Sequence, residues 1–316
     1  MTRTGPETIG LLADPYLNEW QVNALERLQA DRDVTFSLVV SNGRKASEID
    51  DPESWNTRDR ISADDVRQFV NLLRDQKAWS LVLAERNLAK LVDGERPLWR
   101  RHSIENVDCL SEADHVRCDP HTDGTWYEFP DEIVARVAEE CDALVLFGYG
   151  LIRGPILDAP EHGVLSFHPA DIRSYRGMGP PPVFHDGRRR CGATLQRLNE
   201  SIDGGEIVAY DDVAIDDCAT LWDVFDRVAA LQIDLLTEGV ANLHDPAFEP
   251  ATVPEDQLGE IYYRKRRHNL SFSGRILLKN LVGRARRRLR RRSGSDETPV
   301  SSLPSQSPDT ERRSSS

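Results

Sequence analysis

The sequence has no apolar run near the 18 residues that a membrane-spanning helix needs. Its first ten residues, MTRTGPETIG, contain no apolar stretch after the arginine, so a secretory leader is not expected there. The five cysteines are scattered, and Cys109, Cys118 and His121 do not have the spacing of a zinc site. These absences predict a cytoplasmic protein with reduced cysteines and no bound metal.

Lysine is also scarce, and arginine supplies nearly all of the positive charge. From Ile261 onward there are 15 Lys+Arg and 4 Asp+Glu, a balance of +11. Residues 1–260 therefore hold 40 − 15 = 25 basic and 53 − 4 = 49 acidic residues, a balance of −24. A body this acidic predicts a halophilic protein, kept soluble where salt screens self-repulsion. It also argues against a nucleic-acid partner outside the basic tail.

Short apolar runs alternate with segments of helical spacing over the first 240 residues, and no internal repeat is present. This order predicts an α/β fold, a Rossmann-like, mostly parallel sheet with helices on both faces. The expected strands are 8–12, 34–40, 143–147, 163–167, 194–198 and 206–215, and the main expected helices are 20–30, 63–92, 131–140 and 221–243.

The composition divides the chain into four parts. Residues 1–245 are expected to form one catalytic domain, and 246–260 a polar linker. Residues 261–292 are arginine-rich and can form a basic helical extension. Residues 293–316 are a Ser/Pro-rich tail that cannot bury enough apolar surface to fold.

Two residues in the first part can carry acid–base chemistry. His168 follows the expected strand Gly163–Phe167, at the end where open α/β sheets bind ligands. A histidine in that place can lie at a cleft, and it titrates near neutral pH. Asp203 lies in a Gly-flanked turn after the next strand, so it can approach His168, favour the imidazolium and orient a water molecule. Taken singly, a His-Pro turn and an Asp-Gly-Gly hairpin are ordinary surface features.

The order of these residues carries a family resemblance. The segments DALVLFGYGLIRGPILDAPEHGVLSFHPADIRSYRG and CGATLQRLNESIDGGEIVA place Gly163, His168-Pro169, Tyr175-Arg176-Gly177, Gly192-Ala193-Thr194 and Asp203-Gly204-Gly205 in register. This pattern resembles the folate-dependent formyltransferases, which formylate glycinamide ribonucleotide, initiator methionyl-tRNA or nucleotide-linked amino sugars. Weaker strand–helix similarity extends from about residue 7 to residue 243, so the resemblance implies the formyltransferase fold.

The resemblance also implies roles for individual residues. The formyl donor would be 10-formyltetrahydrofolate, and His168, Asp203 and Ser166 would be the catalytic residues. Tyr175, Arg176 and Gly177 would bind substrate. The backbone of one loop would hydrogen-bond the pterin ring, and glycines permit the close approach that a flat ring needs. That loop is Phe147, Gly148, Tyr149, Gly150, Leu151 and Ile152.

One position departs from the family pattern. The family has asparagine two residues before the histidine, where its amide donates to the developing oxyanion, and this chain has Ser166. The loop Ala170-Asp171-Ile172-Arg173 also differs from the usual Ser-Leu-Leu-Pro. Two readings follow. One is an active enzyme, and the other is a catalytically weak or inactive binding protein for folate or a sugar nucleotide.

Two of the three acceptor classes of the family are disfavoured by the sequence. The first strand runs into Asp14-Pro15-Tyr16 without the Gly-rich loop of the purine members. The methionyl-tRNA members carry an additional β-barrel domain that is not expected after Leu243. A nucleotide-linked amino sugar is therefore the expected acceptor, with methionyl-tRNA formyltransferase-type activity as an alternative.

The apolar residues of the arginine-rich segment are also regularly spaced. Apolar residues recur at near-helical spacing among seven arginines, which is typical of a helix that lies on an anionic membrane surface. A solvated tail attracted to the acidic body and a nucleic-acid contact are the alternatives. The protein is thus expected to be cytoplasmic, and peripheral at the membrane under the first reading. The apolar set is Ile276, Leu277, Leu278, Leu281, Val282, Ala285 and Leu289.

Overall fold

The structure, a computed structural model, describes residues 5–43, 77–93 and 96–293. The helix expected over Ala63–Val92 is therefore described only in its second half, as α4 (Trp79–Asp93). The tail expected over 293–316 lies outside the described residues, apart from Ser293 at the end of a helix.

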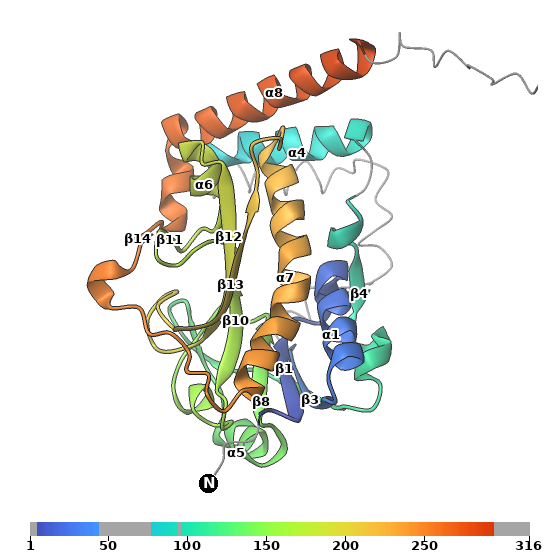
Figure 1. The fold of residues 1–316 in the computed structure, drawn as a ribbon, viewed down its shortest axis with the longest axis vertical. Coiled ribbons are helices and arrows are strands. Elements are labelled where there is room, and N and C mark those ends of the chain that lie inside the picture. Colours follow the sequence, from blue (N-terminus) through green and yellow to red (C-terminus); the bar gives the residue numbers. More distant parts are fainter. Residues whose placement is uncertain (1–4, 44–76, 94–95, 294–316) are drawn as a thin grey trace, which may run out of the picture.

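A seven-stranded sheet lies at the centre of the described part of the chain, in the order β13-β12-β10-β8-β1-β3-β5 (Figure 1). β5, β3, β1, β8 and β10 are parallel neighbours, and β12 and β13 continue the sheet antiparallel. The prediction of a mostly parallel α/β sheet is confirmed. The strands are β1 (Thr8–Ala13), β3 (Thr35–Asn42), β5 (Asp114–Cys118), β8 (Ala143–Phe147), β10 (Val164–His168), β12 (Arg190–Arg197) and β13 (Glu206–Ala214).

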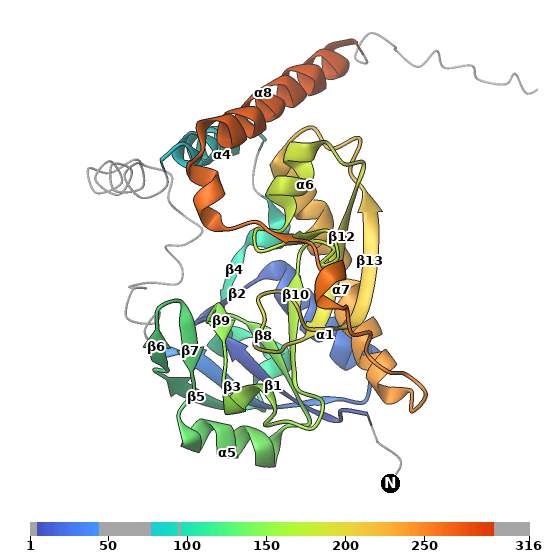
Figure 2. The ribbon, with the colours of Figure 1, turned by 90° about the vertical axis from the view of Figure 1, so that its left-hand side faces the viewer.

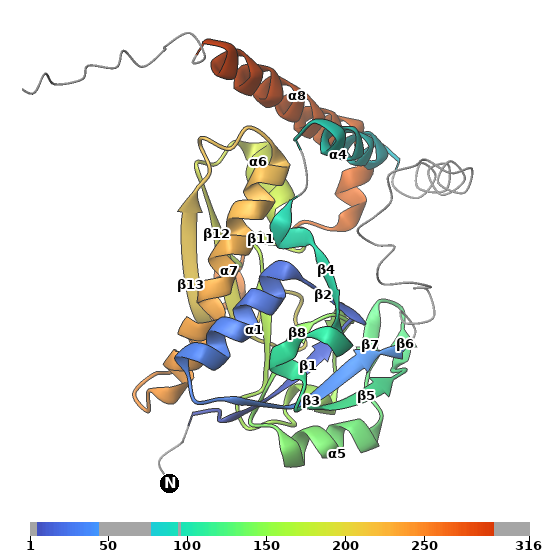
Figure 3. The ribbon, with the colours of Figure 1, turned by 90° about the vertical axis from the view of Figure 1, so that its right-hand side faces the viewer.

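Helices cover both faces of this sheet, as expected. α1 (Glu19–Asp31) and α7 (Leu221–His244) lie side by side on one face (Figure 3), and α5 (Asp131–Glu140) packs on the other (Figure 2). Alternate residues of β1 supply the two cores: Ile9 and Leu11 face α1 and α7, while Leu12 faces α5. Side chains of a strand point to opposite faces in turn, so one buried strand serves both layers.

Local sequence signals account for the helix boundaries. α7 begins after Thr220, whose hydroxyl accepts from the N–H of Asp223, while the Asp223 carboxylate accepts from the N–H of Thr220. This reciprocal capping satisfies two donors that a helix start otherwise leaves without partners. α5 begins after Pro130 with two acidic residues in its first turn, which suits the positive end of the helix dipole.

Short strands outside the central sheet pair with one another in the described part of the chain. Three small sheets are formed by β2 (Tyr16–Asn18) with β4 (Arg101–Ser103), by β6 (His121–Asp123), β7 (Trp126–Glu128) and β9 (Leu151–Ile152), and by β11 (Tyr175–Arg176) with β14 (Glu260–Ile261). α6 (Pro180–Asp186) starts with three prolines, a residue type suited to the first helical positions. In the described ranges before residue 260, 3₁₀ turns lie at 97–99, 104–106, 108–110, 155–157 and 255–257.

The segment expected as a linker, 246–260, runs back along the body. Ala251 exchanges two backbone hydrogen bonds of 2.9 Å with Ile207, next to the main sheet. Its last residue, Glu260, begins β14, which pairs with β11. The segment therefore connects the carboxyl-terminal part of the chain to the same body that holds the predicted catalytic residues.

The arginine-rich segment is helical, as expected. A 3₁₀ turn (Arg264–His268) leads into α8 (Leu270–Ser293), which lies across one end of the molecule against α4 and α6 (Figure 1). Ile276, expected on a membrane-facing surface, is instead fully buried against the body. Among the described helices none combines the length and the hydropathy needed to cross a bilayer.

We predict that Ile276→Ala lowers the free energy of unfolding by about 2–4 kcal/mol, because it leaves a cavity in a packed site. Leu278→Ala, two residues along the same helix and 62% exposed, is the matched control and is expected to change it by less than about 0.5 kcal/mol. Urea unfolding of both variants and the parent measures the difference. Equal effects would contradict the docking of α8.

Candidate functional site

Three neighbouring parallel strands end together at one edge of the main sheet. β1 ends next to Asp14, β8 next to Gly148, and β10 at His168. The chain leaves β1 through α1 toward β3 on one side, whereas β8 lies on the other side of β1. The junction between β1 and β8 is therefore the topological switch point of the sheet, the place where open α/β sheets bind ligands.

A cavity of about 350 Å³ lies at this switch point. Phe147 and Phe167 stack with their ring centroids 6.0 Å apart, and the edge of Trp20 meets both rings at 5.6 and 5.7 Å. Aromatic walls with a few polar groups are typical of sites that bind a flat organic ligand. The other lining residues are Asp14, Gln21, Trp99, Leu146, Gly148, Gly150, Ser166, Pro169, Phe225, Val228 and Gln232.

Some residues of the loop after β8 line this cavity, and others are buried in the core. Gly148 approaches the end of β1 so closely that a Cβ there would lie 2.2 Å from the backbone nitrogen of Asp14, which requires glycine. The Tyr149 N–H donates to Oδ1 of Asp14 at 3.3 Å, and its ring packs against Phe129 at 4.9 Å in the core under α5. Ile152 is buried in that core too.

Of the six residues predicted to bind the pterin, the structure thus places Phe147, Gly148 and Gly150 at the cavity. Tyr149 and Ile152 support the loop from behind, and Leu151 with Ile152 forms β9, paired with β7. Their predicted role in binding the donor stays a prediction.

His168 and Asp203 lie in contact, although 35 positions separate them in the sequence. Nδ1 of His168 is 3.2 Å from Oδ1 of Asp203, and Nε2 is 2.7 Å from the carbonyl oxygen of Tyr175. Both partners accept hydrogen bonds, so the ring satisfies both only when each nitrogen carries a proton. The geometry therefore fits the imidazolium form, held by one carboxylate.

The expectation that His168 opens onto the cleft differs from the structure. His168 is 3% exposed, because the chain after β10 folds over the ring and offers it the Tyr175 carbonyl. Its neighbours Phe167 and Pro169 line the cavity, as does Ser166. The ring thus lies directly behind the cavity wall.

Asp203 occupies a turn between β12 and β13 with a φ of 45°, a strained conformation for a residue with a side chain. Its Oδ2 accepts from the N–H of Gly177 at 2.6 Å, and its Oδ1 accepts from Nε2 of Gln196 at 3.4 Å. Burial on its own would raise the pKa of Asp203, but the charge of His168 and these hydrogen bonds outweigh it and lower the pKa below its ordinary value. The carboxylate therefore stays ionised beside the ring.

The Tyr175-Arg176-Gly177 run, predicted to bind substrate, makes contacts inside the protein. Nε of Arg176 donates to the carbonyl oxygens of Ile202 and Asp203, at 2.9 and 3.1 Å. A Cβ at Gly177 would lie 2.5 Å from a Tyr262 carbonyl, and its φ of 90° also favours glycine. In this structure the run fixes the turn that carries Asp203, and its predicted contact with substrate stays a prediction.

Sequence reasoning missed most of the cavity wall. Trp20 comes from α1, Trp99 from a 3₁₀ turn, and Phe225 and Gln232 from α7, so no local motif connects them. Gln196 was also missed, and it holds both Asp203 and the N–H of Gly205. Gln196 could have been found, since it lies inside the motif-bearing segment CGATLQRLN.

A metal site and a cysteine nucleophile have less support in the described residues. Among the described residues no three His, Cys, Asp or Glu side chains come together as metal ligands do. The five cysteines are all free thiols, and burial raises the pKa of Cys191 to about 12. A thiol with so high a pKa is a poor nucleophile.

The fold and the site define an open α/β protein with a ligand cavity at its switch point. The family described as "Formyl transferase" matches residues 121–240. This segment contains the 147–152 loop, Ser166, His168 and Asp203. Residues 121–240 of this chain are therefore similar to the formyl transferase family.

Individual proteins show the same similarity. Methionyl-tRNA formyltransferase of Rhodopseudomonas palustris is 32% identical over 129 residues, which is 40% of this chain and 42% of that protein. The chain thus spans about two fifths of the length of this relative.

Two solved structures share the fold. One is a sugar N-formyltransferase from Shewanella sp FDAARGOS_354, with a TM-score of 0.51 at 16% identity, over 87% of this chain and 88% of that one. The other is an N-formyltransferase from Helicobacter canadensis in complex with folinic acid and dTDP-3-aminofucose, with a TM-score of 0.50 at 11% identity, over 87% and 80%.

We predict that Asp203→Asn destabilises the protein by about 2–4 kcal/mol at pH 7, because it removes the charge partner of a buried histidine. The lowered pKa means that the ionised carboxylate stabilises the fold above its ordinary pKa of about 4, and that this contribution is lost as pH falls through the lower folded value. The gap between parent and variant should therefore shrink below about pH 4.

Urea unfolding from pH 3 to pH 7 tests this. Asp216→Asn, in an exposed pair with Arg189 at 3.3 Å, is the control and should change stability by less than about 1 kcal/mol. If the difference in free energy of unfolding between the parent and Asp203→Asn does not change with pH, the charge of Asp203 is not the cause of that difference.

Proposed function

We propose that the protein transfers a formyl group from 10-formyltetrahydrofolate to a primary amine. The observation that carries the proposal is the position of the cavity. Its wall includes the end of β10, the strand that carries His168, which is in contact with Asp203. The family match over 121–240 spans both features and supports the same conclusion.

The cavity fits a folate-type donor. Phe147, Phe167 and Trp20 offer aromatic faces and edges to a flat bicyclic ring. Gly148 and Gly150 leave the backbone open to close approach, while Gln21 and Gln232 offer amide donors and acceptors at the wall. The bound donor would supply the activated formyl carbonyl.

The transfer forms a bond between the amine nitrogen and the formyl carbon, and it breaks the bond from that carbon to the folate nitrogen. Negative charge develops on the formyl oxygen, and the ring of His168, on the strand whose end lines the cavity, would donate to that oxygen. The Asp203 carboxylate lies against Nδ1 of the same ring. In the net reaction the amine loses one proton and the departing nitrogen gains one, a transfer suited to a histidine.

The structure sets a condition for this role. Nε2 of His168 is bonded to the Tyr175 carbonyl, so the ring must exchange that acceptor for the substrate oxygen. The contact between Asp203 and Nδ1 would be kept while the ring turns about it. Catalytic hydrogen bonds commonly form only in the substrate complex, so the contact seen here is compatible with activity.

For the acceptor we propose an amino sugar carried on a nucleotide. The Helicobacter canadensis protein of similar fold is described in complex with dTDP-3-aminofucose, and the Shewanella protein is a sugar N-formyltransferase. The relative at 32% identity acts on methionyl-tRNA, which is the alternative. The charge of −24 over residues 1–260 opposes a polyanionic acceptor such as tRNA and supports the smaller one.

A binding protein is the second candidate. The observation that favours it is that both nitrogens of His168 already have partners inside the protein. The sequence resemblance, which implies asparagine at the position of Ser166, points the same way. Such a protein would hold folate in the same cavity without turnover.

Turnover of 10-formyltetrahydrofolate with a panel of nucleotide-linked amino sugars tests the proposal. We expect His168→Asn to lower the rate by about a hundredfold or more, because the variant loses the titratable ring. Asp216→Asn, on the exposed surface, should leave it unchanged. Binding of folate without turnover on any amine would favour the binding protein, and absence of folate binding would contradict both candidates.

Ser166 gives a second test at the same site. We expect Ser166→Asn to raise the rate and Ser166→Ala to lower it, because one well-aimed oxyanion donor is worth about 10²–10³ in rate. Steady-state rates of the three forms on one substrate, at equal folate saturation, measure the effect. A slower Ser166→Asn variant would mean that serine is adapted to a different acceptor or acyl group.

A further inference from the structure

α8 binds the body of the protein through one of its faces. Phe272 and Ile276 are buried on this face, and Phe272 stacks on Trp79 of α4 at 6.5 Å. A Cβ at Gly283 would lie within 1.6 Å of the Ala219 carbonyl, so the helix backbone rests directly on the turn before α7. The orientation of α8 about its own axis is therefore fixed.

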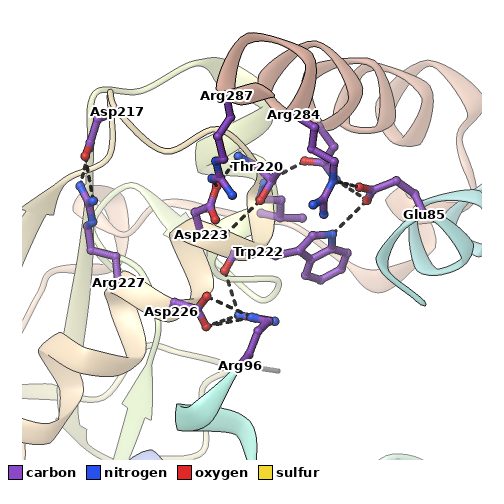
Figure 4. Close-up of polar contacts among 12 residues, drawn as sticks. Glu85, Arg96, Asp217, Thr220, Trp222, Asp223, Asp226, Arg227, Arg284 and Arg287 are labelled. Carbon is purple, nitrogen blue, oxygen red and sulfur yellow. Dashed lines mark hydrogen bonds and ion pairs between the residues drawn. The ribbon is translucent and has the colours of Figure 1, made fainter. Parts of the chain in front are cut away.

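Polar contacts on the same face lock this orientation (Figure 4). The buried carboxylate of Glu85, on α4, accepts from Asn280 at 2.9 Å, from Arg284 at 2.6 Å and from Trp222 of α7 at 3.0 Å. Arg287 forms an ion pair with Asp223 at the start of α7. Two of the arginines of the basic segment are thus bound to the body and do not serve an external partner.

The opposite face of α8 carries exposed apolar side chains. Leu278, Val282 and Leu289 are spaced by four and seven residues, which places them within about 40° of one another around a helix. Leu278 and Leu289 are 62% and 65% exposed. All large hydrophobic side chains that are exposed in the described ranges lie on α4, on α8 or at Tyr263 just before it. We call the three α8 residues the outer stripe.

Arginines border the outer stripe on both sides. At about 100° per residue, Arg275 and Arg286 project roughly 60–80° to one side of it and Arg288 roughly 80° to the other. All three are exposed. Their long aliphatic stems can lie along an apolar surface while the charged heads reach anionic groups beside it.

We propose that the outer stripe of α8 is a docking surface for an anionic lipid membrane. An apolar stripe with arginines on both sides matches the boundary between lipid tails and negative headgroups. The body carries −24 over residues 1–260 and is repelled by such a membrane, so contact is confined to the α8 end of the molecule, where this helix is outermost (Figures 1 and 2).

Two other occupants fit the surface less well. A second copy packed through the same stripe would bring the flanking arginines of both helices together, at an electrostatic cost. A nucleic acid would meet leucines at the centre of the surface, where phosphate contacts need cations. The membrane proposal is independent of formyl transfer, so each can fail alone.

The test is flotation of the full chain with vesicles of phosphatidylcholine containing 30% phosphatidylglycerol, and with pure phosphatidylcholine. We expect the parent to bind the anionic vesicles, and Leu278→Ser/Leu289→Ser to lower the partition coefficient about tenfold or more. Leu278→Ile/Leu289→Ile keeps the apolar area and is the matched control, so it should bind like the parent.

The arginines have their own pair of variants. Arg286→Gln/Arg288→Gln should weaken binding to anionic vesicles, and high salt should do the same. Arg117→Gln/Arg189→Gln, exposed on the body, should not.

The proposal is overturned if the parent does not float, if it binds both vesicle types equally, or if the serine variant binds like the parent. A parent dimer that the serine variant converts to monomer in sedimentation, without vesicle binding, would assign the stripe to a second copy. Tighter association with RNA than with anionic vesicles would assign it to nucleic acid.

Discussion

The parallel pairing of β1 with β8 brings the backbone of Gly148 against the backbone of Asp14 at the centre of the sheet. This contact leaves no room for a side chain, and it turns the chain sharply after β8. Phe147 is then directed toward Phe167 and Trp20, while the Tyr149 ring enters the core on the other side. The cavity, its aromatic wall and its position at the strand ends all depend on this one close approach.

The second constraint is the turn that carries Asp203. Its positive φ is held by the Arg176 guanidinium from β11, by Gly177 from the segment between β11 and α6, and by Gln196 from β12. These contacts bring a carboxylate to the ring of His168. The Tyr175-Arg176-Gly177 run thus holds Asp203 against His168, and β14 connects the run to the carboxyl-terminal part of the chain.

The sequence predicted what depends on short-range pattern. Alternating apolar runs gave the strands β1, β3, β8 and β10 and the helices α1, α5 and α7, and the motif spacing brought His168 to Asp203. The burial of His168 could not be foreseen, because it depends on how residues 169–177 fold back over the strand. The cavity wall could not be foreseen either, since Trp20, Trp99 and Phe225 meet only through tertiary packing.

The orientation of α8 could not be predicted from the sequence either. Helical spacing correctly indicated a basic helix near the carboxyl end, yet it could not say which apolar residues face the body. Glu85, on a different helix, binds Asn280 and Arg284 on the face of α8 that also buries Ile276, and Leu278 lies outward.

The central claim is that one cavity, at the end of β1 and β8, holds a folate beside the His168–Asp203 pair. A crystal structure of the protein with folinic acid tests it most directly. The account predicts density for the flat ring against Phe147, Phe167 and the backbone of Gly148, with Nε2 of His168 released from Tyr175. Ligand density elsewhere on the molecule, with this cavity empty, would contradict the account.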